Sequence, residues 1–166
     1  MAKWEIKNPG DYQRAAGRIN EKLDDLRRAL KQVPAQTIHE CLTDTLEKSV
    51  ARTPVDEGPL RESGHVAVDG VRTVRGRADG SIHVQQNYVP NEEAAEVTFE
   101  IGYTVEGGGS GREGDVNTYA WVQHEHVEFN HPNGGEAKFL ETAINEDKPT
   151  WGPRIKTAVR EQLKGG

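Results

Sequence analysis

An alternating stretch in the middle of the chain decides the class of fold: Glu96-Val97-Thr98-Phe99-Glu100-Ile101-Gly102-Tyr103-Thr104-Val105. Apolar and aromatic side chains occupy the odd positions, and charged or hydroxyl side chains occupy most even ones. Successive side chains of a strand point to opposite faces of a sheet, so this period of two predicts a strand with one buried face. The stretch therefore predicts an antiparallel sheet that another layer covers on one side.

Two further β-rich runs precede this strand, Val71 to Arg77 and Ser81 to Tyr88. The residues between them, Ala78-Asp79-Gly80, contain an Asp-Gly pair, which is a strong hairpin signal. Val66 and Val68 indicate an earlier strand. We expect a meander of three or four antiparallel strands, and its apolar face requires a helical layer.

The first fifty residues predict a pair of helices. Asp11 can cap the first helix, whose apolar stripe recurs every three or four residues at Ile19, Leu23, Leu26 and Leu30. Pro34 suits the first turn of a second helix. That helix carries a stripe at Ile38, Leu42, Leu46 and Val50, and Pro54 stops it. The short joint at Pro34 predicts that the two helices are antiparallel neighbours.

The C-terminal end predicts two more helices. Phe139, Leu140, Ala143 and Ile144 mark a short one, which Pro149 should break. Thr150 can cap a last helix with one face formed by Trp151, Ile155, Val159 and Leu163. The expected fold is α+β, an antiparallel sheet of three or four strands packed against N-terminal and C-terminal helices.

Composition limits the classes of function. The chain has 166 residues, which suits a single domain, and its net charge is −6. Residues 53–135 hold 5 basic and 14 acidic side chains, a net charge of −9. This acidic region argues against a protein that coats nucleic acid. The single cysteine, Cys41, excludes an intramolecular disulfide and a zinc site built on several cysteines.

The apolar content is low. Leu, Ile, Val and Phe together make up 33 of the 166 residues, just under the level at which disorder becomes a concern. A folded domain with so small a core often completes its burial against partner subunits. No apolar run approaches the ~20 residues that span a bilayer, and the N-terminus has no apolar signal core, so we expect assembly in a reducing cytoplasm.

Residues 106–115 contain five glycines and predict a flexible segment. The segment has no lysine, so it cannot form a phosphate-binding P-loop. It is either a mobile surface loop or a loop that becomes ordered against a partner.

Residues 124–131 have the strongest chemical character, since they include His124, His126 and His131 beside Glu125 and Glu128. A helical zinc motif needs histidines four residues apart, and here the first two are two apart. Metal binding is therefore the weaker reading, and we expect no cofactor. Cys41 lies beside Leu42 in a helix stripe, which favours a buried thiol over a nucleophile.

The stretch from 51 to 63 joins the helices to the sheet: Ala51-Arg52-Thr53-Pro54-Val55-Asp56-Glu57-Gly58-Pro59-Leu60-Arg61-Glu62-Ser63. Pro54 ends the helix, Asp56 can cap a single turn and Gly58-Pro59 restrains the path. Leu60 should anchor this connector in the core. A helix-to-sheet connector explains all of these residues without any activity.

This connector resembles a motif of the tail-completion, head–tail joining or minor capsid proteins of long-tailed double-stranded DNA bacteriophages. Residues that fit the motif are Ala51, Pro54, Val55, Asp56, Gly58, Leu60, Arg61 and Ser63, whereas Glu57 stands where the family usually has threonine. Later parts of the family pattern resemble Tyr119-Ala120 followed by Glu125, and Phe139-Leu140 at the start of a late helix. The resemblance covers roughly residues 12–145.

The resemblance implies a structural virion protein and not an enzyme. It implies a homo-oligomeric ring at the head–tail junction, with six copies favoured and twelve as the second choice. The neighbours would be the head connector or stopper and the tail tube or tail terminator. DNA would pass through the channel without specific binding, and assembly would take place in the host cytoplasm, away from any membrane. The alternatives are a tail terminator ring and, in a different class, a metal-binding protein or hydrolase using His124, His126 and His131.

Overall fold

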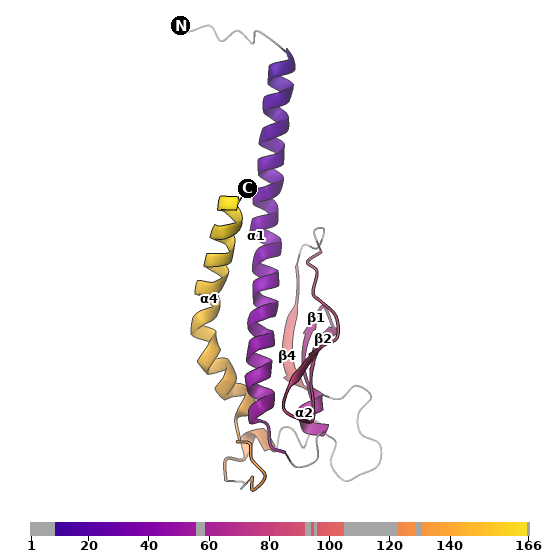
Figure 1. Cartoon of the computed structure of the whole chain (residues 1–166), viewed down its shortest axis with the longest axis vertical. Coiled ribbons are helices and arrows are strands. Elements are labelled where there is room, and N and C mark those ends of the chain that lie inside the picture. Colours follow the sequence, from indigo (N-terminus) through magenta and orange to yellow (C-terminus); the bar gives the residue numbers. More distant parts are fainter. Residues whose placement is uncertain are drawn as a thin grey trace.

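The computed structural model describes residues 9–55, 59–91, 94, 96–104, 123–128 and 131–165. Its helices are α1 (Pro9–Arg52), α2 (Pro59–Ser63) and α4 (Phe139–Gly165), and its strands are β1 (Gly64–Val68), β2 (Val71–Gly76), β3 (Ile82–Val84) and β4 (Phe99–Tyr103). The expected α+β class is confirmed. Helix α1 lies in the middle, with the sheet on one side and α4 on the other (Figure 1).

Helix α1 runs without interruption through Pro34, so the predicted pair of N-terminal helices is wrong. Proline inside a helix removes one backbone hydrogen bond and costs about 3 kcal/mol. Packing along α4 offsets this cost, because α4 lies antiparallel to α1 on both sides of the proline. On the C-terminal side of Pro34, Thr45 of α1 donates a hydrogen bond to Asp147 of α4. On its N-terminal side, Leu26 of α1 lines a hollow together with Leu163 of α4.

Helix α4 is also continuous, and the predicted break at Pro149 is wrong. Pro149 and Pro153 both lie on the exposed side of the helix, as does Asn145 one turn earlier. The backbone carbonyls that the prolines leave without a donor can therefore be hydrated. Thr150 is no helix cap here, because its hydroxyl donates to the backbone carbonyl of Asp147 (2.7 Å).

The sheet has four antiparallel strands in the order β3-β2-β1-β4. The predicted hairpin between β2 and β3 is confirmed, but the expectation of a simple meander is wrong, because β4 pairs with β1. Asp69 explains this placement. It begins the β1–β2 turn with a positive φ of 50°, its backbone N–H donates to Thr98, and its carboxylate accepts from the Thr98 N–H. The start of β4 is thereby held beside β1.

Strand β4 alternates as predicted over the described residues. Phe99 and Ile101 are half-buried, Tyr103 is buried, and Glu100 is exposed. Strand β1, paired on both edges, is buried along its whole length.

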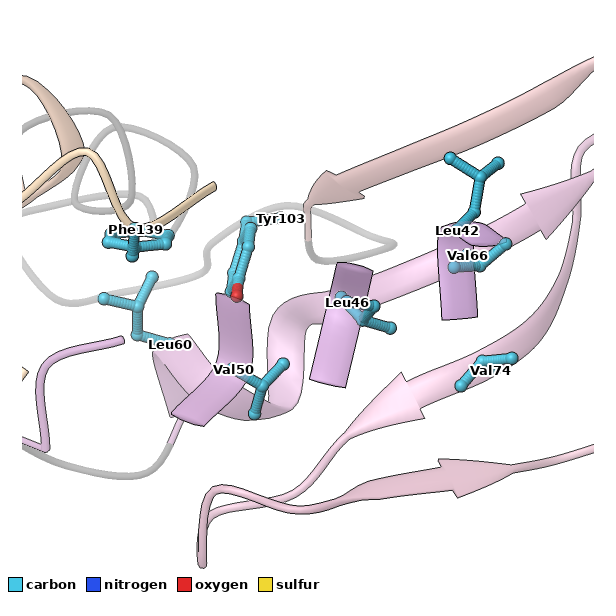
Figure 2. Close-up of a cluster of buried hydrophobic side chains, with 8 residues drawn as sticks. All are labelled: Leu42, Leu46, Val50, Leu60, Val66, Val74, Tyr103 and Phe139. Carbon is cyan, nitrogen blue, oxygen red and sulfur yellow. The ribbon is translucent and has the colours of Figure 1, made fainter. Parts of the chain in front are cut away.

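The core lies between α1 and the sheet. Leu42, Leu46 and Val50 of the predicted α1 stripe pack with five residues from other parts of the chain: Leu60, Val66, Val74, Tyr103 and Phe139 (Figure 2). Cys41 is buried at 1% exposure, as expected, and burial raises the pKa of its thiol. The core therefore joins the second half of α1 and the start of α4 to the sheet.

An ion pair fastens α4 to α1. Asp147 is buried, and its carboxylate accepts hydrogen bonds from Lys48 and from Thr45 (2.9 Å). Burial acts to raise the pKa of Asp147, but the bonds from Lys48 and Thr45 and the charge of Arg154 hold it below its ordinary value of 3.8. A carboxyl with a lowered pKa stabilises the fold above its ordinary pKa and loses this effect as the pH falls through the folded value.

At neutral pH, Asp147→Ala is expected to reduce the free energy of unfolding by about 1–3 kcal/mol, because it removes a buried carboxylate that accepts hydrogen bonds from Lys48 and Thr45. Urea unfolding of both proteins at about pH 7 and about pH 3 measures the difference, which should shrink in acid. A difference that stays constant with pH would contradict the assigned role of the carboxylate.

Candidate functional site

The connector between α1 and β1 contains the residues with the most specific sequence signal. Helix α1 ends at Arg52, as Pro54 predicts, and Pro54 is buried while Val55 is half-buried. Leu60 lies in the short helix α2 at 3% exposure, so its predicted burial is confirmed. Asp56 and Gly58 lie outside the described residues.

Arg61 is the best-connected side chain of the connector. It is buried at 8% exposure, and its Nε donates to the backbone carbonyl of Thr53 (3.0 Å). Its Nη1 and Nη2 donate to the carbonyls of Ala78 (3.4 Å) and Ala51 (3.5 Å). The last carbonyls of a helix have no partner within the helix, so Arg61 caps α1 and ties it to the β2–β3 turn.

A cluster of buried hydroxyl groups lies next to the Arg61 contacts. The Tyr103 hydroxyl bonds with the hydroxyls of Ser49 (2.8 Å) and Thr53 (2.9 Å), and burial raises its pKa to about 12. Ser63 donates its own hydroxyl to the carbonyl of Leu60 (2.7 Å). These hydroxyls are engaged in structural bonds, and a tyrosine with so high a pKa stays neutral at physiological pH.

The second stretch of the resemblance meets the first in space. Phe139 begins α4 at 1% exposure and packs edge-on against Tyr103, with ring centroids 4.8 Å apart. Leu60 lies in the same cluster (Figure 2). Leu140 is half-buried against this core. Tyr119 and Ala120 lie outside the described residues.

Glu125 holds the segment before α4 in place. Its carboxylate pairs with Lys138 and with His124, and both hydrogen bonds lower its pKa. The backbone N–H of Lys138 donates to the carbonyl of His124 (2.8 Å), and the N–H of Glu136 donates to the carbonyl of Arg52 (2.8 Å). This segment therefore closes over the end of α1.

The three histidines do not converge. His124 bonds to Glu125 (2.8 Å), and His126 bonds to Glu128 (2.6 Å). His131 has a buried Nε2 atom with no hydrogen-bond partner among the described residues. Residues 123–125 are helical, so the extended form that would align His124, His126 and Glu128 is not adopted there. Over the described ranges, no group of three His, Cys, Asp or Glu side chains could hold a metal ion.

Chelator treatment is expected to leave the melting temperature of the protein unchanged, because His124 bonds to Glu125 and His126 bonds to Glu128, so the two histidines do not share a site. Thermal unfolding with and without EDTA measures this. A drop of several degrees that zinc alone restores would contradict the prediction and favour the metal-binding alternative.

Two parts of this site were not found from the sequence. The Ser49–Thr53–Tyr103 cluster combines residues from α1, the connector and β4, and Asp147 accepts a hydrogen bond from Thr45, 102 positions away in sequence. A signal existed in the spacing of Thr45, Ser49 and Thr53, which are four residues apart and form a polar ridge beside the apolar stripe.

No family model, curated protein or solved structure matches this chain. The resemblance of the connector to phage neck proteins therefore stays a hypothesis from sequence. Among the described residues, no helix is both long and apolar enough to cross a membrane.

Proposed function

We propose that the chain is a structural protein of the bacteriophage neck, forming a ring that joins the head connector to the tail around the DNA channel. One observation carries the proposal. The two stretches that resemble the tail-completion family lie about eighty residues apart in sequence, and Leu60 and Phe139 from them meet in one core. These two residues hold the fold together, which supports a structural role for the stretches that contain them.

The chemistry of the connector supports a structural role over a catalytic one. The guanidinium nitrogens of Arg61 donate to backbone carbonyls, and the Ser63 hydroxyl donates to the carbonyl of Leu60. A nucleophilic enzyme needs a hydroxyl or thiol beside a base that can activate it. Ser63 and the buried Cys41 do not offer this arrangement in the described part of the chain.

The charge distribution supports the passage of DNA. Residues 53–135 carry a net charge of −9, and such a surface repels a phosphate backbone over about 8 Å at physiological salt. The ring would hold six copies, with twelve as the second choice. Its neighbours would be the connector or stopper on the head side and the tail tube or terminator on the tail side.

A native mass measurement of the purified protein tests the ring. The expected result is a closed oligomer of six chains, visible in electron micrographs as a ring with a central channel. A protein that stays monomeric at high concentration would overturn the proposal.

A genetic test addresses the place in the virion. In a phage that encodes this chain, a stop codon in its gene should yield filled heads and separate tails, and supply of the protein in trans should restore joined particles. Joined, infectious particles in the absence of the protein would rule out the neck role. This outcome does not depend on the ring measurement.

A further inference from the structure

The N-terminal part of α1 presents an apolar stripe that the described residues cover only in part. The helix extends well beyond the sheet (Figure 1). We call Ile19, Leu23, Leu26 and Leu30 the stem stripe, and their exposed fractions are 59%, 48%, 40% and 59%. Four large apolar side chains so exposed on one helix face mark an interaction surface.

The stem stripe continues the interface between α1 and α4. Steps of three and four along α1 lead from Leu30 through Val33 to Thr37, Cys41 and Thr45, so these residues share one side of the helix. Thr45 on this side bonds to Asp147 of α4. The end of α4 reaches the stripe where Leu163 shares a hollow with Leu26. The side of α1 that packs against α4 therefore continues toward the N-terminus of α1, beyond the end of α4.

A second apolar surface lies at the end of the sheet nearest the stem. A groove of about 270 Å³, which we call the tip groove, separates α1 from the segment before β4. Its lining includes Ala35, Ile38, Tyr88, Pro90, Val97 and Phe99. This volume is below the ~300–1,000 Å³ typical of small-molecule sites, so inserted side chains are better occupants than a ligand.

The edge of the tip groove is polar, and its lining includes the exposed Lys31 of α1. Exposed Glu96 lines the groove, and Asp69 lines an adjoining hollow that shares Tyr88 and Val97 with it. The Tyr88 hydroxyl is buried and has no hydrogen-bond partner in the described ranges. A polar side chain from a docked partner could form a hydrogen bond with this hydroxyl.

Charge decides which partner fits the stem stripe. Residues 9–33 carry six basic and four acidic side chains, and residues 154–165 carry four and one, so the stem has a net charge of +5. Two such stems side by side would repel each other. The described residues of the region 53–135, which contains most of the tip groove, hold seven acidic and four basic side chains, a net charge of −3. Opposite charges steer these two different surfaces together.

We propose that the stem stripe of one copy docks in the tip groove of the next copy. Leu23 and its neighbours would fill the groove, while the basic side chains of Arg18 and Lys22 face Glu96. Such a contact is heterologous, because it uses different surfaces on the two copies, and it generates a ring when the rotation closes. The inference rests on the ring assembly of the proposed function and names the surfaces that build it.

The test uses the full chain with one surface changed at a time. Leu23→Glu alters the stem stripe and Val97→Lys alters the tip groove, while Val127→Glu changes a side chain that is 71% exposed elsewhere and is the matched control. Melting temperature checks folding, and Ile19→Glu replaces Leu23→Glu if the latter unfolds the stem. Native mass should fall to the monomer for either surface variant and stay at the ring mass for the control.

Mixing the two defective variants gives the decisive result. The Leu23→Glu chain keeps an intact groove and the Val97→Lys chain keeps an intact stem, so the mixture should form a heterodimer and no larger species. A mixture that stays monomeric, or rings that survive either single change, would overturn this interface and leave the ring itself standing. A wild-type protein that is monomeric would overturn both.

Discussion

Replacing Leu60 by alanine is expected to lower the free energy of unfolding by about 2–4 kcal/mol, the range for a buried leucine. Leu60 is 3% exposed and belongs to the same cluster as Val50, Tyr103 and Phe139. The substitution removes the apolar anchor of α2 and leaves a cavity where α1, the sheet and α4 meet. Urea unfolding of wild type and variant measures the change.

Leu163→Ala is the matched control, because the same atoms are removed at a position that is 49% exposed. It should change the free energy of unfolding by less than about 1 kcal/mol, since less apolar area is lost from burial. Equal effects of the two substitutions would show that Leu60 is not the anchor of the connector.

Gly135→Ala is expected to destabilise the protein by about 3 kcal/mol or more. Gly135 has a positive φ of 100°, and a methyl group there would lie 2.4 Å from Cα of Pro54. Backbone strain contributes about 1–3 kcal/mol, and overpacking contributes a further 1–3 kcal/mol or so. The clash would push the segment before α4 away from the end of α1, and thermal or urea unfolding would detect it.

Gly134→Ala is the control that separates the cost of backbone strain from the cost of the steric clash with Pro54. Gly134 has a similar φ of 95°, but a methyl group there would meet no atom within 4 Å. The substitution should therefore cost only the strain, about 1–3 kcal/mol. If both variants lose the same stability, the contact between Gly135 and Pro54 does not hold the segment in place.

Local patterns in the sequence predicted the elements whose burial follows a simple period. The alternation around Ile101 predicted β4, the Asp-Gly pair predicted the β2–β3 hairpin, and spacing by four predicted the buried stripe that contains Leu46. Leu60 was predicted as an anchor because it was the apolar residue available in its connector. In each case the signal that allowed the prediction lies within a few residues along the chain.

Partners distant in sequence decided the rest of the candidate site. The connector sequence predicted that Leu60 is buried, but it could not show that Arg61 reaches the carbonyl of Ala78 in the β2–β3 turn. Spacing also could not predict that Tyr103 would bond to the hydroxyls of Ser49 in α1 and Thr53 just after it. Such pairs depend on how the layers are placed, and the sequence of one element does not contain that information.

The sequence by itself determined the class of fold, the faces of the main elements and the connector. The tertiary structure alone decided that the helices continue through Pro34, Pro149 and Pro153 and that β4 lies beside β1. Local rules compare a proline with an isolated helix, whereas packing between α1 and α4 supplies enough stabilisation to keep both helices whole. The period of the stripe at Ile19 to Leu30 showed which face is apolar, and only the positions of α4 and the sheet showed that the described residues cover this face only in part.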